Sequence, residues 1–373
     1  MSLKTSKEIM EKRIKIGITQ GDINGIGYEL IFKTFSEPTL LDMYTPIIYG
    51  SPKVATFHRK ALEMNVNFTT INSAANAVDG KLNIVTCFDE EVKIELGKPS
   101  ETAGTAALLA LEFAMREYEH GLFDVLVTAP VNLETMHNNA IRFLENEDYL
   151  QSKFDDDYSS LTILLNRNLR IGLLTGKMAV KDVPEAITKE LIVEKATVFH
   201  ESLKHDFLID NPRIAIIALN PTTGISDSNG REETEQIIPA IGELRDSGLQ
   251  CFGPYAADSF FSSEDIWKFD GVLAMYYDQG MIPFRTFGMF EGVSYVAGLP
   301  LVCAAPVHGV GYEVAGKNMA DETGFRNAIY LVSDILRNRR VDDYAHRNPL
   351  PKLYTAKHDD SDKLNLEKEE ETE

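Results

Sequence analysis

Basic residues are scarce in this 373-residue sequence: 37 Lys and Arg stand against 57 Asp and Glu, so the formal net charge is −20. Nucleic-acid binding takes much of its affinity from basic side chains that displace counterions from the phosphates. Anionic membrane surfaces repel an acidic chain for the same electrostatic reason. The composition therefore excludes nucleic acid and membrane as the main partners.

Cysteine and long apolar runs are scarce as well. Cys87, Cys251 and Cys303 lie far apart, in no spacing typical of a metal site. An odd and sparse cysteine count is typical of a reducing compartment. The N-terminal residues lack the apolar centre of a signal peptide, and no stretch approaches the ~18 apolar residues of a membrane span. We therefore expect a cytoplasmic protein.

Short runs rich in Val and Ile alternate with helical patterns along the chain. Such runs are typical of buried strands in a parallel sheet. The expected strands are Ile14–Ile18, Tyr44–Tyr49, Leu82–Val85, Val125–Thr128, Ile163–Leu165, Ile171–Leu174, Ile214–Leu219 and Gly271–Met275. The clearest helical patterns are Ser100–Glu119, Lys189–Lys204 and Glu232–Ser247. Alternation of this kind predicts an α/β fold with a mostly parallel sheet.

Polar or glycine-rich loops follow several of these strands, at residues 19–27, 129–132, 220–224 and 276–280. Ligands of open α/β sheets bind beyond the carboxyl ends of the strands, so these loops predict a binding crevice. The residues alone leave two alternatives open. Asp22 and Asn24 suit ligand contact or an Asx-type turn, and Asp278 and Gln279 suit a pocket wall or a helix cap.

Six segments, taken in order, resemble the 4-hydroxythreonine-4-phosphate dehydrogenase family: ITQGDINGIGYEL, TAPVN, ALNPTTG, AMYYDQG, AGLPLV and VHGVGYEVAGK. The resemblance extends roughly from Ile14 to Pro351. It implies oxidation and decarboxylation of the substrate with NAD, on the route to pyridoxal 5′-phosphate. It also implies a divalent metal held by three histidines, and a homodimer whose site is shared between the subunits.

The same resemblance implies a two-domain α/β/α subunit with mostly parallel sheets, like that of the isocitrate and isopropylmalate dehydrogenases. We place a discontinuous first α/β domain at residues 1–140 plus 308–355 and a second α/β domain at residues 141–307. Residues 356–373 are rich in Asp and Glu and nearly devoid of apolar side chains. That composition predicts a disordered acidic tail.

All three metal-histidine positions implied by the resemblance are substituted in this sequence. Lys177 and Tyr277 stand at two of them, and the loop after Pro221 contains no histidine for the third. An ammonium group repels a divalent cation, and hydroxyl groups are weak ligands. We therefore expect the metal ligands of the family to be absent here.

The substrate-contacting positions are altered too. A Glu145–Asp148 segment replaces the family's GHTE, Arg285 replaces a phosphate-contacting lysine, and Leu133 replaces the lysine after TAPVN. The adenine-side motif keeps the pair His308 and Gly309, where His308 suits nucleotide contact or a plain turn. The candidate substrate- or cofactor-binding residues are Asp22, Asn24, Asn220, Gln279, Arg285, His308 and Gly309.

Three functions stay open on this sequence. We favour a diverged homologue that has lost the metal-dependent family reaction, as a homodimer or as the partner of an intact paralogue. The second is a metal-independent NAD-linked dehydrogenase for another small substrate. In it Lys177 or Tyr277 transfers the proton, and Asp278 is a further candidate catalytic residue. The third is a small-molecule binding protein that uses the polar loops. Retention of the original reaction is the least favoured.

Overall fold

The computed structural model describes residues 13–88, 92–136, 146–154, 157–167, 169–222, 230–288 and 291–347. The predicted tail at residues 356–373 and the predicted domain boundary at residues 140 and 141 lie outside these ranges. None of the helices in the described part of the chain has the length and apolar character that a bilayer crossing needs.

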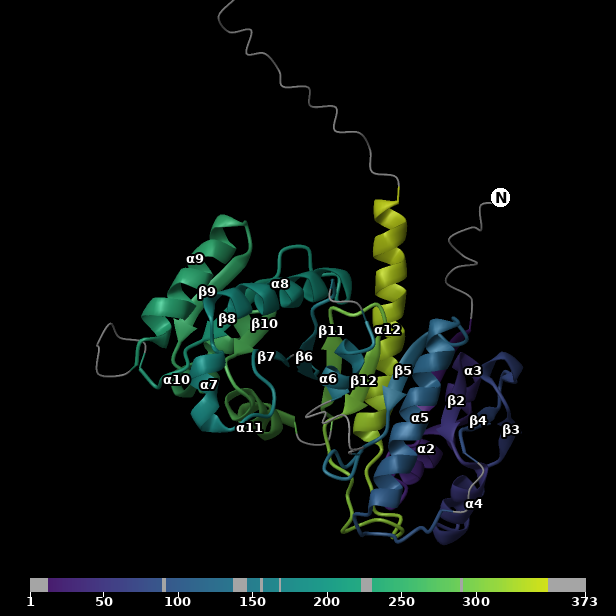
Figure 1. Cartoon of the computed structure of the whole chain (residues 1–373). Coiled ribbons are helices and arrows are strands. Elements are labelled where there is room, and N and C mark those ends of the chain that lie inside the picture. Colours follow the sequence, from purple (N-terminus) through teal and green to yellow (C-terminus); the bar gives the residue numbers. More distant parts are fainter. Residues whose placement is uncertain are drawn as a thin grey trace, which may run out of the picture.

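The described strands form one 12-stranded sheet in the order β3-β4-β2-β1-β5-β12-β11-β6-β7-β10-β8-β9. Figure 1 shows the β3 edge at the right and the β9 edge at the left. Strand β11 is antiparallel to β12 and β6, β6 is antiparallel to β7, and the other neighbouring pairs are parallel. The expected α/β class with a mostly parallel sheet is therefore confirmed.

The strands are β1 Ile14–Thr19, β2 Tyr44–Gly50, β3 Phe68–Ile71, β4 Leu82–Thr86, β5 Val125–Thr128, β6 Leu161–Asn166, β7 Leu169–Leu173, β8 Arg213–Ile217, β9 Gln250–Tyr255, β10 Gly271–Ala274, β11 Val293–Ala297 and β12 Cys303–Pro306. The α-helices are α2 Gly27–Phe35, α3 Pro38–Met43, α4 Pro52–Ala61, α5 Glu101–Glu119, α6 Asn146–Gln151, α7 Val183–Ala186, α8 Lys189–His205, α9 Ile238–Asp246, α10 Ala257–Phe261, α11 Tyr277–Gly288 and α12 Thr323–His346. Short helical turns are η1 Ala74–Asn76, η2 Val180–Asp182, η3 Glu233–Ile237 and η4 Glu264–Lys268.

Each strand expected from its apolar run is present, and its ends agree within two residues. Four strands were missed: β3, β9, β11 and β12. Strands β3 and β9 are the edges of the sheet, where one neighbour is lacking and the side chains are partly exposed. Strand β12 is the short sequence CAAP, and β11 carries a serine at its second position. None of the four has the continuous apolar run that marks a fully covered strand.

Helix α5 illustrates how the local sequence specifies an element. The Ser100 hydroxyl accepts a hydrogen bond from the Ala103 N–H at 3.2 Å and caps the helix, and Gly121 follows its end with a φ of 66°. Ala103, Ala107 and Leu111 recur at helical spacing and are buried. That face packs against β1 and β2. The cap, the terminal glycine and the apolar face agree in placing the helix.

Helix α12 joins the two halves of the sheet, which are the strands from β3 to β5 and the strands from β12 to β9 in the sheet order. It packs against β5, β11 and β12 and also contacts α2 and α8, and Figure 1 shows it in yellow where the halves meet. Strand β12 lies within the predicted second domain, at residues 141–307, yet it pairs with β5 from the first. The division into two domains therefore stays a prediction.

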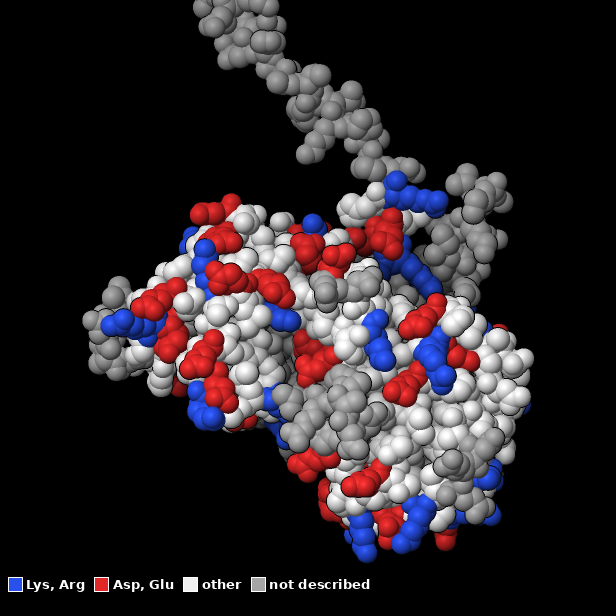
Figure 2. All heavy atoms as spheres, in the orientation of Figure 1, with Lys and Arg blue, Asp and Glu red and all other residues white. Residues whose placement is uncertain are grey.

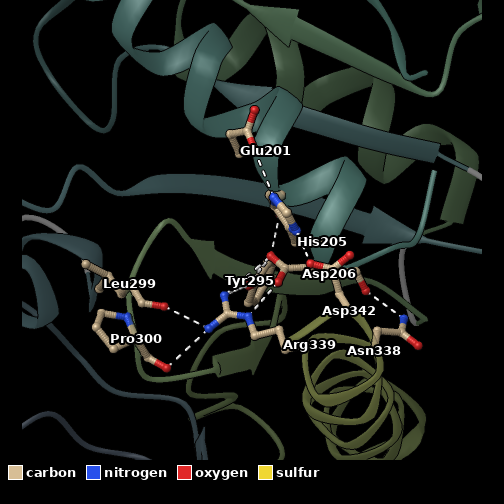
Figure 3. Close-up of polar contacts among 10 residues, drawn as sticks. Glu201, His205, Asp206, Tyr295, Leu299, Pro300, Asn338, Arg339 and Asp342 are labelled. Carbon is tan, nitrogen blue, oxygen red and sulfur yellow. Dashed lines mark hydrogen bonds and ion pairs between the residues drawn. The ribbon is translucent and has the colours of Figure 1, made fainter. Parts of the chain in front are cut away.

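A buried polar network connects α12 to β11 and to the end of α8 (Figure 3). The Arg339 guanidinium donates to Asp206 Oδ1 at 2.6 Å, and the Tyr295 hydroxyl donates to Asp206 Oδ2 at 2.7 Å. Arg339 Nη1 also reaches the carbonyl oxygens of Leu299 and Pro300, at 2.9 and 3.2 Å. Asp206 follows α8, Tyr295 lies in β11 and Arg339 lies in α12. One buried carboxylate thus ties three elements together.

We expect Arg339→Met to destabilise the fold by about 3–5 kcal/mol, because it leaves the buried Asp206 carboxylate without its cation. The control is Arg337→Met, which removes an exposed ion pair with Asp334 and costs less than about 1 kcal/mol. Urea unfolding followed by circular dichroism measures both. Equal losses in the two variants would contradict the assigned role of Asp206.

A second contact between α8 and α12 depends on pH. His205 Nδ1 lies 2.5 Å from Asp342 Oδ2, and its Nε2 lies 3.0 Å from Glu201 Oε2. Burial lowers the pKa of His205, but the hydrogen bonds and charges of Asp342 and Glu201 outweigh burial and raise the pKa above its ordinary value. The imidazolium is therefore favoured more in the folded chain than in the unfolded one.

The stabilisation from His205 is complete below the unfolded-state pKa of histidine, about 6.5, and is lost as pH rises through the higher folded-state pKa. We expect the free energy of unfolding to fall more between pH 6 and pH 9 in the wild type than in His205→Gln. Urea unfolding at several pH values measures this difference. Parallel pH profiles for the two proteins would refute it.

Candidate functional site

A cavity of about 220 Å³ lies where the two halves of the sheet meet. Strands β6, β7, β11 and β12, helices α6 and α11 and the loops after β5, β7 and β12 contribute its walls. The described lining residues are Ala129, Pro130, Val131, Leu133, Glu147, Thr162, Leu164, Leu173, Lys177, Tyr277, Met281, Arg285, Ser294, Val296, Ala305, Pro306, Val307, His308 and Gly309. The structure thus brings together Lys177, Tyr277, Arg285, His308 and Gly309 from the candidate set.

Lys177 and Tyr277 lie side by side because their strands are neighbours. Lys177 comes soon after β7 and Tyr277 begins α11 after β10, and β7 and β10 pair in parallel. The Thr175 hydroxyl donates to the Met275 carbonyl at 2.9 Å and holds the two strand ends together. The Lys177 ammonium then lies 5.4 Å from the centroid of the Tyr277 ring. This is the distance of a cation–π contact.

Helix α11 presents three side chains to the cavity at a spacing of four residues. Tyr277, Met281 and Arg285 lie on one helix face for this reason and all line the cavity. Arg285 is exposed and forms no hydrogen bond or ion pair with a described residue. Sequence reasoning missed Met281, although its place in this spacing could have identified it.

His308 adds an unpaired nitrogen to the cavity wall. Its Nδ1 lies 3.3 Å from the Gly309 carbonyl, whereas its Nε2 is buried without a hydrogen-bond partner among the described residues. Burial lowers the pKa of His308, an effect that the Gly309 carbonyl and Asp321 partly oppose. The ring is therefore neutral at pH 7 and offers one nitrogen to a ligand.

Glu147 is the carboxylate of the described lining, and it is already engaged. Its Oε1 accepts a hydrogen bond from Ser160 at 2.9 Å, and Thr162 donates to its Oε2. The Lys195 ammonium lies 3.8 Å from Oε1. The negative charge of Glu147 is thus partly compensated, whereas Lys177 and Arg285 have no described carboxylate partner. Figure 2 shows acidic and basic side chains spread over both halves of the face.

Asp22 and Asn24 do not line the cavity, and their polar atoms bind other parts of the chain. The Asn24 N–H donates to Asp22 Oδ1 at 2.8 Å, which is the Asx-type turn considered for this loop. Tyr312 donates to Asp22 Oδ2 at 2.7 Å, and Asn24 Nδ2 donates to the Lys98 carbonyl at 2.9 Å. Burial raises the pKa of Asp22, which the hydrogen bonds from Tyr312 and Asn24 oppose. These contacts favour the structural alternative.

Backbone geometry also explains two glycines in the loop at residues 19–27. Gly21 has a φ of 71°, and a Cβ there would lie 2.5 Å from the Pro130 carbonyl oxygen. A Cβ at Gly27 would lie 2.3 Å from the Gln20 carbonyl oxygen. Both approaches are too close for any side chain. These two glycines are therefore required because the loop packs tightly against the segment after β5 and against its own backbone.

Asn220 and Gln279 hold strand ends in place. The Asn220 amide donates to Glu232 at 2.9 Å and to Glu233 at 2.8 Å. Gln279 accepts from the Met275 N–H at 2.8 Å and donates to the Ala218 carbonyl at 2.7 Å, which bridges the ends of β10 and β8. Asp278 is exposed and lines a neighbouring cavity of about 570 Å³, together with Lys177 and Tyr277.

The comparisons with known proteins decide the family. A family model described as pyridoxal phosphate biosynthetic protein PdxA matches residues 42–332. This chain belongs to the PdxA family. The curated 4-hydroxythreonine-4-phosphate dehydrogenase of Bacteroides thetaiotaomicron is 50% identical over 357 residues, which cover 96% of this chain and 98% of the relative. The curated 4-hydroxythreonine-4-phosphate dehydrogenase of Sulfurihydrogenibium sp. is 31% identical, and the match covers 88% of this chain and 100% of the relative.

A solved structure agrees with the family assignment. The crystal structure of a 4-hydroxythreonine-4-phosphate dehydrogenase from Burkholderia phymatum has a TM-score of 0.69 and 27% sequence identity, and the match covers 87% of this chain and 99% of that chain. The family resemblance expected from the sequence segments is thereby confirmed.

The described residues do not fit the divalent metal that the resemblance implies. Lys177 and Tyr277, at two of the three histidine positions, form an ammonium–ring contact and offer no imidazole. Among the described residues, no group of three or more His, Cys, Asp or Glu side chains could hold a metal ion. The resemblance expects the third in the loop after Pro221, of which residues 223–229 lie outside the described part. No reaction step is therefore assigned to a metal.

We expect Gln279→Ala to cost about 1–3 kcal/mol of stability, because it leaves the Met275 N–H and the Ala218 carbonyl unpaired. The matched control, Asp278→Ala, changes an exposed neighbour and stays within about 0.5 kcal/mol. Thermal and urea unfolding of both variants measure the costs. A Gln279→Ala variant as stable as the control would show that the bridge has no structural role.

Proposed function

We propose that this chain is a PdxA-family protein that has lost the metal-dependent reaction of its relatives and binds a small anionic molecule in the cavity beside Lys177. One observation carries the proposal: the Lys177 ammonium rests on the Tyr277 ring, at positions where the resemblance expects two metal ligands. A fixed positive charge there excludes a divalent cation by repulsion. The same charge attracts an anion.

The charges and polar atoms of the cavity support an anionic ligand. Lys177 and Arg285 come from different elements and line the same space. Neither forms an ion pair with a described carboxylate, whereas Glu147 is engaged by two hydroxyl groups. The free Nε2 of His308 adds a further polar group. Charge-assisted hydrogen bonds from such cations are the usual means of binding a carboxylate or a phosphate.

Several finer points belong to the same proposal. NAD binds beside His308 and Gly309, as the resemblance implies. The chain forms a homodimer or pairs with an intact paralogue, and it is cytoplasmic. The metal-independent NAD-linked dehydrogenase, with Lys177 or Tyr277 as the proton-transfer group, is less well supported. A lysine that acts as a base is normally desolvated, whereas Lys177 is exposed.

A second candidate function is the activity of the relatives, 4-hydroxythreonine-4-phosphate dehydrogenase. The identity of 50% across 96% of this chain favours it. The first proposal and this candidate differ in one measurable respect, because the relatives' reaction would yield NADH in the presence of a divalent metal. An assay for NADH formation therefore distinguishes the two functions.

We expect no NADH from the purified chain with 4-hydroxythreonine 4-phosphate, NAD and Mg²⁺, Mn²⁺ or Zn²⁺ added in turn. The Bacteroides thetaiotaomicron relative is the positive control under identical conditions. Loss of the metal ligands removes several kcal/mol of charge stabilisation in the reaction, which suppresses turnover below detection. Turnover near that of the control would overturn the proposal and establish the second candidate.

We also expect inorganic phosphate to bind and to raise the melting temperature by mass action. Lys177→Met should weaken the affinity about tenfold or more, as for the loss of one charge-assisted hydrogen bond. Lys181→Met is the control, because Lys181 is exposed beside Asp182 and outside the cavity lining. Isothermal titration measures both. Equal affinity in the two variants would remove Lys177 from the binding site.

A further inference from the structure

Helix α11 turns one face toward the sheet and exposes the other. Its inner face packs against β6, β7 and β10, and Gly280 and Phe284 are buried there. Figure 1 shows α11 on the opposite side of these strands from α8 and α9. Asp278, Ile282 and Arg285 recur at i, i+4 and i+7, so they lie on one side of the helix. All three are exposed, and together they form what we call the outer face of α11.

The middle of the outer face is apolar, and further apolar side chains are exposed at both ends of the helix. Ile282 is 64% exposed. Met178 and Val180 are exposed and line the cavity of about 570 Å³ at the N-terminal end of α11. At the C-terminal end the exposed rings of Trp267 and Phe287 are in contact, with 6.2 Å between their centroids. Exposed apolar side chains that gather in this way, with Trp, Phe and Met among them, are typical of a protein interface.

The outer face also carries one charge of each sign, and neither charge is compensated in the described part of the chain. Asp278 lies in the first turn of α11 and Arg285 in the last turn. Neither side chain forms an ion pair or hydrogen bond with a described residue. Seven residues correspond to about 10.5 Å along a helix axis. The outer face is therefore negative at one end, apolar in the middle and positive at the other end.

A face with this order of charges is complementary to a second copy of itself. When two α11 helices pack antiparallel about a two-fold axis midway between residues 278 and 285, Asp278 of each copy is level with Arg285 of the other. The same rotation places the two Ile282 side chains beside each other at the axis. It also brings the exposed apolar side chains at the N-terminal end of one helix toward those at the C-terminal end of the other. A two-fold interface requires this kind of self-complementary surface.

We propose that two copies of this chain associate through the outer face of α11, with Ile282 at the centre and an Asp278–Arg285 ion pair on each side of it. The proposal rests on the homodimer named in the proposed function and assigns the face that forms it. Arg285 also lines the first cavity, so the second copy lies at the edge of that cavity. A guanidinium has five N–H donors, which suffice for the carboxylate of the second copy and an anionic ligand together.

The test is sedimentation equilibrium of the full-length protein over a range of protein concentrations. We expect the wild type to be a dimer at micromolar concentration. Ile282→Glu should weaken association about tenfold or more, because it places two carboxylates together in the apolar centre of the interface. The matched control is Ile238→Glu, since Ile238 is exposed on α9, which packs against α8. A monomeric wild type, or equal association of the two variants, would overturn the proposal.

Charge reversal tests the antiparallel arrangement. Asp278→Arg and Arg285→Asp each place like charges opposite one another across the two-fold axis, and each should weaken association about tenfold or more. The double variant restores opposite charges in exchanged positions, so it should recover most of the wild-type affinity. Unaffected single variants, or weakened single variants without recovery in the double variant, would refute the arrangement. Circular dichroism and the melting temperature confirm that each variant is folded.

This inference and the proposed function fail in different measurements. Phosphate titration and NADH formation measure binding and turnover in the first cavity, whereas sedimentation measures association of the chains. A monomeric chain that binds phosphate through Lys177 would refute the interface alone. A dimer that responds to the α11 variants and yields NADH would refute the proposed loss of the family reaction alone.

Discussion

The buried ion pair between Asp206 and Arg339 is the constraint on which much of this structure depends. A carboxylate withdrawn from water is costly unless its charge and lone pairs are satisfied. Here Arg339, Tyr295 and Ser202 all donate to it, at 2.6, 2.7 and 2.7 Å. These partners come from α12, β11 and α8. The need to satisfy one carboxylate therefore fixes the position of α12 across the junction of the two sheet halves.

The position of α12 determines which side chains border one face of the sheet. Strands β7, β6 and β11 carry one cavity on each side, because successive side chains of a strand point to opposite faces. One face meets α11 with Lys177, Tyr277 and Arg285, and the other face meets α12 with Arg170 at its centre. Lys177 and Arg285 of the first cavity have no carboxylate partner in the described part of this acidic chain.

Family membership and site chemistry carry different information here. The PdxA family assignment rests on similarity along most of the chain, much of which specifies turns and strand ends. Gln279 bridges two strands, and Asn24 forms three hydrogen bonds with the segment at residues 95–100, so both residues have structural roles. Lys177 and Tyr277 are the reverse case, because they stand where the resemblance expects two metal ligands, and the proposed loss of the family reaction rests on their contact. Overall similarity therefore measures the fold better than it measures the reaction.

The sequence by itself determined the α/β class and the strands with continuous apolar runs, because a strand covered on both faces must be apolar throughout. Through the family resemblance it also proposed Lys177, Tyr277, Arg285 and His308 as site residues; all four line one cavity, and their role stays a prediction. The edge strands β3 and β9 escaped prediction, since partial exposure removes the continuous run. The division at residues 1–140 plus 308–355 and 141–307 stays a prediction.

Only the tertiary structure decided which polar side chains are free. Water satisfies the donors of Asn24 and Arg170 in the unfolded chain, but packing pairs the amide of Asn24 and leaves Nε of Arg170 without a described partner. The cavity between the sheet and α12 likewise depends on β6, β7, β11 and α12, elements that are distant in sequence. Hydrogen-bond satisfaction is a property of the packed chain, and local sequence does not encode it.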